Sequence, residues 1–172
     1  MSVLAVTVLG HDRPGIIAGV TGVLAELGGN LEDSSMTLLR GHFAMTMIVS
    51  TDADADTVGS RVREVLAGSN LVVSVLELPE EDTAPQAGTD YLLSVHGADR
   101  PGIVSAVAGL LAAHGGNVID LTTRLAGSLY VLIAEVVVPR EVDVVELDAK
   151  LAELAAELGV DASLRPADTD VL

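Results

Sequence analysis

The sequence contains no cysteine and no tryptophan, and aromatic residues make up only 2% of its 172 residues. Without cysteine there is no disulfide framework, no thiolate nucleophile and no zinc site of the cysteine type. Basic residues are also scarce: nine Lys and Arg stand against 25 Asp and Glu, which gives a formal net charge of -16. This charge repels phosphate backbones and anionic lipid surfaces, so we expect no direct nucleic-acid partner and no membrane partner.

Long apolar runs are missing as well. No stretch approaches the roughly 20 apolar residues that are needed to span a bilayer, and the first residues lack the charged start and apolar run of a signal peptide. We therefore expect a cytoplasmic protein. Hydrophobic residues nevertheless make up 49% of the chain, which is enough for a folded core.

An internal repeat sets the organisation of the chain. A shift of 87 positions aligns GHDRPGIIAGVTGVLAELGGN, residues 10–30, with GADRPGIVSAVAGLLAAHGGN, residues 97–117, and thirteen of the 21 positions are identical. A repeat of this kind fixes the unit of architecture. We predict a first domain at 1–78, a linker at 79–88 (PEEDTAPQAG), a second domain at 89–166 and a C-terminal tail at 167–172.

Each copy predicts the same order of elements. In the first copy, a β-branched strand over 3–9 precedes an amphipathic helix, with Pro14 suited to the first helical position and Gly28 and Gly29 ending it. Two strands over 31–39 and 43–51 form a hairpin around Gly41, and a second helix and a strand over 71–78 follow. The fold class predicted from this order is α+β: two ferredoxin-like βαββαβ sandwiches in tandem, each with both helices on one face of an antiparallel sheet.

The repeated G-x-D-R-P-G segment is the first candidate for a binding site. It lies between a strand and a helix N-terminus, where free backbone amides and the helix dipole favour a carboxylate or a phosphate. An aspartate beside those amides could hold an ammonium group, so the loop suits an amino-acid zwitterion. The alternative is that Asp only caps the helix and that Pro and Gly only start it. The candidates are Gly10, His11, Asp12, Arg13, Gly15 and Ile16, with Gly97, Asp99, Arg100, Gly102 and Ile103.

Asn30 and Asn117 form the second repeated polar feature, just after the Gly-Gly pair. An amide side chain both donates and accepts hydrogen bonds, whereas the alternative for each Asn is a turn residue or a left-handed one. The helix places each Asn at the opposite end of its own copy from the loop. We therefore predict two sites across a pseudo-twofold axis, in which the loop of one copy faces the Asn of the other.

We do not expect these two sites to be equivalent. The first loop has His11 where the second has Ala98, and Glu32 and Ser34 follow Asn30 where Ile119 and Leu121 follow Asn117. Hydrogen-bonding groups discriminate between ligands more strongly than apolar walls do, so one site should bind more tightly.

Other chemistry has little support in the sequence. The four histidines show no metal-ligand spacing, and His114, which replaces Leu27 of the first copy, is expected to pack in the core. The run DADAD at 52–56 lacks the glycine and the terminal glutamate of a calcium loop, so we interpret it as the acidic start of a helix. We expect no catalytic residue, no metal and no cofactor.

Both copies resemble ACT domains, and DRPGI, GGN followed by D, and the closing SLRP resemble the glycine cleavage system transcriptional repressor family. This resemblance implies small regulatory domains that bind amino acids at interfaces between paired copies, and Asn30 and Asn117 fall at the ligand-contacting Asn of serine-binding relatives. It implies a non-catalytic homo-oligomer that senses a small amino acid of the glycine or serine class. It also implies action on a partner protein, such as a separate DNA-binding regulator. The alternative is a ligand-free interaction adaptor.

Overall fold

The computed structural model describes residues 2–79 and 87–167. The chain divides into two compact units, Met1–Thr83 and Ala84–Leu172. Most of the predicted linker and of the tail after Ala167 lies outside the described residues, so their exact bounds stay predictions. No helix in the described ranges is long and apolar enough to cross a membrane.

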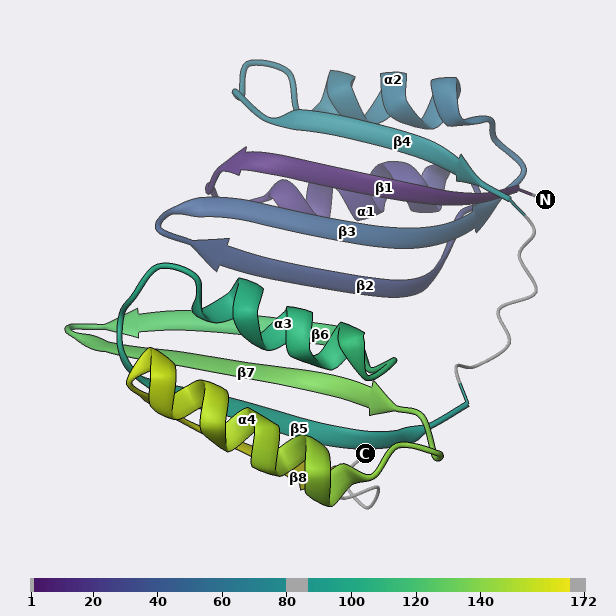
Figure 1. Ribbon diagram of the computed structural model, residues 1–172. Helices are drawn as coiled ribbons and strands as arrows, with labels where there is room; N and C mark the ends of the chain where they lie inside the picture. Colours follow the sequence, from purple (N-terminus) through teal and green to yellow (C-terminus); the bar gives the residue numbers. More distant parts are fainter. Residues whose placement is uncertain (1, 80–86, 168–172) are drawn as a thin grey trace. The chain divides into compact units, whose positions relative to one another are not determined.

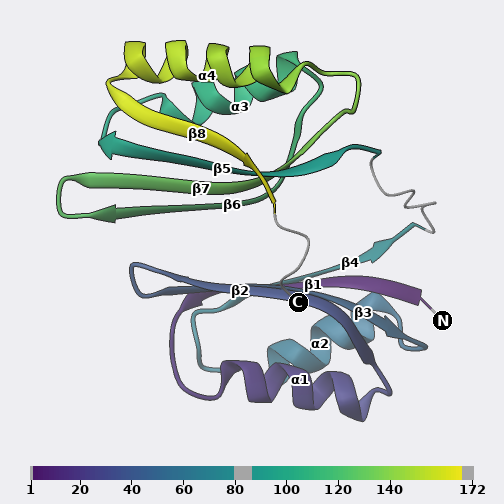
Figure 2. The same cartoon turned by 90° about the horizontal axis from the view of Figure 1, so that it is seen from below.

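Unit 1 is a four-stranded antiparallel sheet with the strand order β2-β3-β1-β4. Both helices lie on the same face of this sheet (Figures 1 and 2). The elements are β1 (Ser2–His11), α1 (Ile16–Glu26), β2 (Asn30–Leu39), β3 (His42–Thr51), α2 (Ala55–Val65) and β4 (Val72–Leu78).

Unit 2 repeats this topology with the strand order β6-β7-β5-β8, again with both helices on one face (Figures 1 and 2). Each sheet is built from one half of the chain, so the predicted ferredoxin-like fold, twice in tandem, is confirmed. The elements are β5 (Thr89–Ala98), α3 (Ile103–Ala113), β6 (Asn117–Ala126), β7 (Leu129–Val138), α4 (Val144–Leu158) and β8 (Val160–Pro166).

Buried and exposed residues alternate along the strands, and the buried ones mark the face of the sheet that the helices cover. In β1, Leu4, Val6 and Val8 are fully buried against the helices, because alternate residues of a strand point to the same side. The opposite face of the sheet has no helix on it. It carries the most exposed large apolar side chains of β4, Val72 at 66% and Leu76 at 64% exposed.

The hairpin between β2 and β3 turns at Arg40 and Gly41, whose φ angles are 50° and 81°. Two successive positive φ angles define a type I′ turn, which matches the twist of antiparallel strands. The predicted turn at Gly41 is therefore confirmed, and it sets the pairing of His42 with both Leu39 and His11.

The start of α1 differs from the prediction. Its first helical residue is Ile16, two positions after Pro14, which lies in the turn before the helix. The N-cap is Gly15, in a left-handed conformation with φ 92°, and Gly102 does the same for α3 with φ 94°. The left-handed Gly15 ends the turn that contains Pro14, so the helix begins at the next residue and Pro14 stays outside it. As a consequence α1 has 11 residues and a length of about 16 Å.

Both repeated helices end in the same way. The amide N–H of Gly28 donates to Ala25 O at 3.0 Å and that of Gly29 donates to Leu24 O at 2.8 Å. These two bonds, with Gly28 at φ 67°, form a Schellman motif. Gly115 and Gly116 repeat it at the end of α3. The predicted role of the Gly-Gly pair as a helix stop is confirmed.

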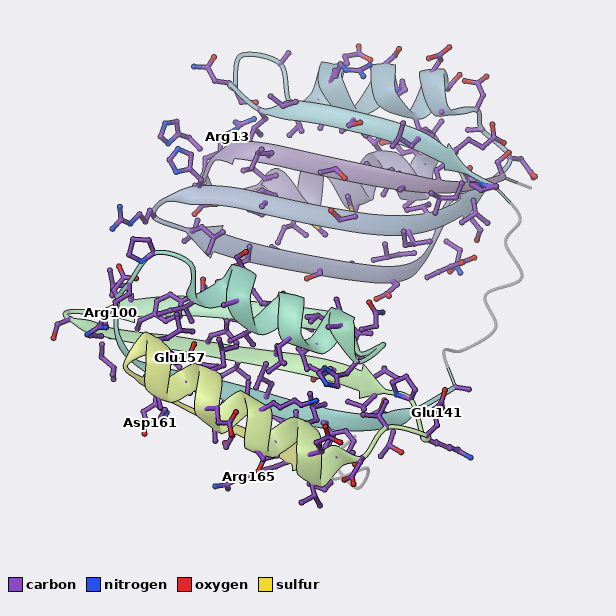
Figure 3. All side chains as sticks on the ribbon, in the orientation of Figure 1. Arg13, Arg100, Glu141, Glu157, Asp161 and Arg165 are labelled. Atoms are coloured by element: carbon purple, nitrogen blue, oxygen red, sulfur yellow. The ribbon has the colours of Figure 1, made fainter. Side chains whose placement is uncertain are left out.

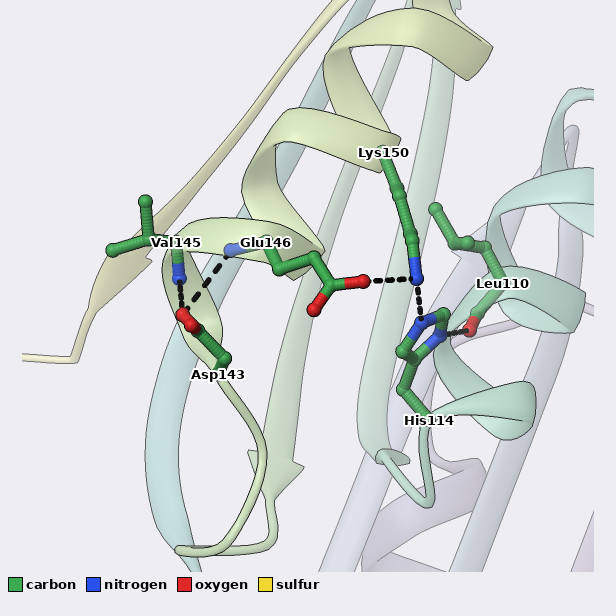
Figure 4. Close-up of polar contacts among 6 residues, drawn as sticks. All are labelled: Leu110, His114, Asp143, Val145, Glu146 and Lys150. Atoms are coloured by element: carbon green, nitrogen blue, oxygen red, sulfur yellow. Dashed lines mark hydrogen bonds and ion pairs between the residues drawn. The ribbon is translucent and has the colours of Figure 1, made fainter.

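His114, the C-cap of α3, joins this helix to α4 rather than only packing in the core (Figure 4). Its Nε2 lies 3.1 Å from Lys150 Nζ, and Lys150 Nζ is 2.7 Å from Glu146 Oε1. Because an ammonium group only donates, Nε2 is the acceptor and the ring proton is on Nδ1, which donates to Leu110 O at 2.8 Å. The half-buried ring thus has a polar role that Leu27, at the equivalent position of unit 1, cannot have.

We predict that the two units unfold independently. Leu132 is fully buried in the core of unit 2, so Leu132→Ala should destabilise that unit by about 2–5 kcal/mol. Hydrogen exchange measured by mass spectrometry should then show faster exchange in residues 87–167 and unchanged exchange in 2–79. Val6→Ala is the matched variant for unit 1 and should give the converse pattern. Equal loss of protection in both halves would contradict independent units.

Gly15 and Gly22 should respond to alanine with opposite signs. A Cβ at either position meets no atom within 4 Å, so steric clash is absent from both variants. Gly15→Ala should still destabilise the protein by about 1–2 kcal/mol, because it forces an L residue into the left-handed region. Gly22→Ala, inside α1, should stabilise it by up to about 1 kcal/mol. Urea unfolding midpoints measure both, and a neutral or stabilising Gly15→Ala would refute the left-handed start.

Candidate functional site: the open helix starts after β1 and β5

The four helices begin in two different ways. Asp54 caps α2 by accepting from Thr57 N at 2.7 Å, and Asp143 caps α4 by accepting from Val145 N and Glu146 N. The backbone and side-chain hydrogen bonds from Thr57 also hold the pKa of Asp54 below its usual value. DADAD is therefore the start of a helix, as predicted. By contrast, α1 and α3 have no side-chain cap and no acidic residue in the first turn.

The first-turn amides of α1 and α3 are consequently free to bind an external acceptor. A helix leaves its first N–H groups without partners in the helix, and among residues 2–79 and 87–167 no side chain accepts from them. The alternative that Asp12 and Asp99 only cap these helices is therefore wrong. The positive end of each dipole is also not neutralised from within the first turn.

A cleft of about 450 Å³ opens at the start of α1. Its volume falls within the range of about 300–1,000 Å³ that is usual for small-molecule sites. Gly15 borders it with open space around its Cα, so a ligand can approach the main chain closely. The cleft is lined by residues 12–18, together with Met36 and Phe43.

The predicted loop residues divide between this cleft and other roles. Asp12 and Arg13 are exposed and line the cleft, and the Asp12 backbone N–H donates to Gly41 O at 3.1 Å. In unit 2 the guanidinium of Arg100 reaches the C-terminal end of α4 (Figure 3), where its atoms lie 3.0–3.1 Å from the position of a Cβ on Gly159. There its charge meets the negative end of the helix dipole.

Two pairs of predicted site residues are held by packing. A Cβ on Gly10 would lie 2.7 Å from Asn70 O, and a Cβ on Gly97 would lie 2.9 Å from Val160 Cα. Glycine is therefore required there by the neighbouring backbone. Ile16 and Ile103 are each only 2% exposed and belong to the two cores. Their side chains anchor the helix start, and only their backbone N–H groups belong to the open turn.

Asn30 and Asn117 are exposed and begin β2 and β6. Neither has a positive φ, so the alternative of a left-handed residue is wrong. Asn30 lies level with Val3 near the start of β1, because Asn30 pairs with Ser50 and Ser50 pairs with Val3. The loop follows His11, at the other end of β1. Eight residues of β1 separate these two ends by about 27 Å. One unit alone therefore does not bring its own loop and Asn to one small ligand.

Met36 and Phe43 are cleft residues that the sequence analysis did not identify. They lie diagonally on the same face of the hairpin, because Leu38 pairs with Phe43 and Met36 with Met45. The two copies of the repeat differ at these positions, and this difference could have drawn attention to them. The shift of 87 places Thr123 at the position of Met36 and Tyr130 at that of Phe43. The equivalent surface in unit 2 thus carries two hydroxyl groups where unit 1 carries a thioether and a phenyl ring.

Comparisons with known proteins agree with this architecture. A UPF0237 protein of Methanopyrus kandleri is 47% identical over 83 residues, which cover 47% of this chain and 91% of that protein. The glycine cleavage system transcriptional repressor of Escherichia coli is 26% identical over 171 residues, covering 94% of this chain and 88% of the repressor. The first relative thus corresponds to one unit, and the second to the whole tandem.

A solved structure shows the same tandem. The crystal structure of an unknown protein from Galdieria sulphuraria superposes with a TM-score of 0.82 at 30% identity, over 97% of this chain and 99% of that one. The family model described as "ACT domain" matches residues 2–70 and again residues 89–165. Two βαββαβ units with the same open helix start, matched along both halves by one family model, show that this chain belongs to the ACT domain family.

Proposed function

We propose that this chain is a non-catalytic regulator that senses a small amino acid of the glycine or serine class and acts on a partner protein in the cytoplasm. The observation that carries the proposal is the contrast between helix starts: α2 and α4 are capped by aspartate, whereas α1 and α3 are open behind a glycine. An open start of this kind suits a carboxylate, which accepts from backbone N–H groups near the positive end of the dipole.

The other groups that line the cleft in unit 1 suit the ammonium group and the side chain of an amino acid. Asp12 supplies a carboxylate for the ammonium group, and a charge-assisted hydrogen bond of this type is stronger than a neutral one. Ile17, Met36 and Phe43 supply an apolar wall against which only a small side chain needs to pack. Asp99 and Gly102 hold the equivalent positions in unit 2.

Each site is proposed to be completed by the Asn of another copy of the unit: residues 10–16 with Asn117, and residues 97–103 with Asn30. Because each Asn lies at the far end of its own unit, this pairing is the arrangement by which both repeated features serve one ligand. The pairing units come from the same chain or from two chains of a homo-oligomer.

The charge of the chain and one of its relatives support regulation through a partner. A formal net charge of -16 disfavours direct contact with nucleic acid, and a similar chain is a transcriptional repressor of the glycine cleavage system in Escherichia coli. We propose that any transcriptional effect runs through a separate DNA-binding protein. A gel shift showing tight, salt-sensitive binding of the purified chain to one promoter would exclude this arrangement.

A ligand-free adaptor is the second candidate function. It is favoured by the uncovered face of the unit 1 sheet, where Leu9, Val72 and Leu76 are 48%, 66% and 64% exposed. Apolar side chains grouped on one face are typical of protein–protein contact. In this case the open helix starts would have no ligand.

A thermal-shift screen of the twenty amino acids separates the two functions. An amino acid that binds only the folded chain at 100 times its Kd should stabilise it by about 2.7 kcal/mol and raise the melting temperature. We expect this response from glycine or serine and not from amino acids with bulky side chains. If none of the twenty raises the melting temperature, the sensor is wrong and the adaptor remains.

Replacement of Asn30 and Asn117 tests whether these two residues belong to the proposed sites. Asn30→Ala and Asn117→Ala each remove one or two hydrogen bonds to the ligand, which are worth about 0.5–1.5 kcal/mol apiece. Calorimetry should show about a tenfold loss of affinity at one site in each variant. Asn70→Ala, at the only other asparagine of the sequence, is the matched control and should bind as the wild type does. Unchanged affinity in both variants would show that these Asn take no part.

A further inference from the structure

Two histidines lie opposite each other at the end of β1, outside the cleft. His11 and His42 are directly opposite each other in the pairing of β1 with β3. Their ring centroids are 4.7 Å apart and the ring planes are inclined by 31°. Both side chains are exposed, so both rings have nitrogen atoms within reach of solvent.

The separation of the rings suits a shared metal ion. Two imidazoles that bind one ion at about 2.0–2.1 Å, with their nitrogens about 90–110° apart at the metal, have ring centroids about 4.5–5.2 Å apart. The observed 4.7 Å lies in this interval. Imidazole suits zinc, copper and nickel, whereas calcium and magnesium prefer oxygen ligands.

The backbone holds the pair in place without a ligand. His11 is the last residue of β1 and His42 the first of β3, and the next residue, Asp12, donates its N–H to Gly41 O at 3.1 Å. The type I′ turn at Arg40 and Gly41 fixes the other side of His42. Little conformational entropy is therefore lost when an ion joins the two rings.

We propose that His11 and His42 form a binding site for a divalent transition-metal ion, with water completing the coordination. The described residues contain no group of three or more His, Cys, Asp and Glu that would hold a metal, so the site depends on these two imidazoles. The net charge of -16 raises the concentration of cations near the surface and favours their capture. This site shares His11 with residues 10–16 of the proposed amino-acid site, but it lies outside the cleft and would hold an ion whether or not the cleft binds an amino acid.

Unit 2 provides an internal control. The positions equivalent to His11 and His42 are Ala98 and Leu129, which pair in the same register. The other exposed histidine, His96, lies 3.7 Å from Asp161 and has no second imidazole opposite it, because it pairs with Val131. The proposal therefore predicts one ion per chain.

Calorimetric titration of the untagged, full-length chain with Ni²⁺ tests this site. Excess Mg²⁺ is present throughout to occupy carboxylates on the acidic surface. The wild type should bind one Ni²⁺, and His11→Ala and His42→Ala should each weaken binding at least tenfold, because even loss of a residue behind a metal ligand costs about 10–100-fold. His96→Ala should bind as the wild type does. Circular dichroism spectra confirm that these exposed-site variants remain folded.

A gain-of-function variant makes the test sharper. Ala98→His combined with Leu129→His places two imidazoles at the equivalent pair of unit 2 and should raise the stoichiometry from one Ni²⁺ to two. The proposal is overturned if the wild type binds no Ni²⁺, if His11→Ala and His42→Ala bind it unchanged, or if His96→Ala abolishes binding. A stoichiometry of one Ni²⁺ in the double variant would also contradict it, because two histidines paired in this register would then not be enough to bind an ion.

Discussion

A single backbone constraint at Gly15 and Gly102 shapes the rest of the candidate site. With φ angles of 92° and 94°, these residues end the short loop after each strand and immediately precede the first residue of the helix. Glycine adopts this conformation at little cost, but it has no side chain with which to cap the helix. The helix start therefore stays open, and its free amides lie where the strand ends. The capped starts of α2 and α4 show that the chain closes a helix with aspartate elsewhere.

The duplication of the unit determines how an open helix start could take part in a binding site. Within a unit, the open start and the repeated Asn lie at opposite ends of the sheet, as the register of β1, β3 and β2 requires. A βαββαβ unit alone thus carries the two repeated features at separate ends. The two units have also diverged. Unit 1 has His11, Met36 and Phe43 where unit 2 has Ala98, Thr123 and Tyr130, so the two proposed sites would present different groups to a ligand.

Much of this fold was predictable from the sequence because its signals are local. The period of the strands, the Gly-Gly stops and the turn at Gly41 each act over a few residues, and the structure confirms them. The start of α1 was predicted wrongly because Pro14 satisfies the usual preference for the first helical position, whereas the left-handed Gly15 overrides it. A glycine does not reveal its φ angle in the sequence.

Features that depend on strand register were not predictable in this way. His11 and His42 are 31 positions apart in the sequence, and they meet only because β1 pairs with β3 in one particular register. The same holds for Met36 and Phe43 in the cleft, and for His114, whose partner Lys150 comes from a different helix. In each case the contact joins two different strands or helices. Loop residues such as Asp12 were identifiable because they are consecutive and repeated.

The central claim is that the open starts of α1 and α3 bind a carboxylate. Titration of the ¹⁵N-labelled chain with unlabelled glycine and serine, followed by NMR, tests it most directly because each first-turn amide gives its own signal. The account predicts downfield shifts of the amide protons of Ile16 to Ala18 and of Ile103 to Ser105. The amides of Ala55 to Thr57 and of Val144 to Glu146 should stay unchanged, because they begin the capped helices. Unchanged amides at the start of α1 and α3, or equal shifts at all four helix starts, would contradict it.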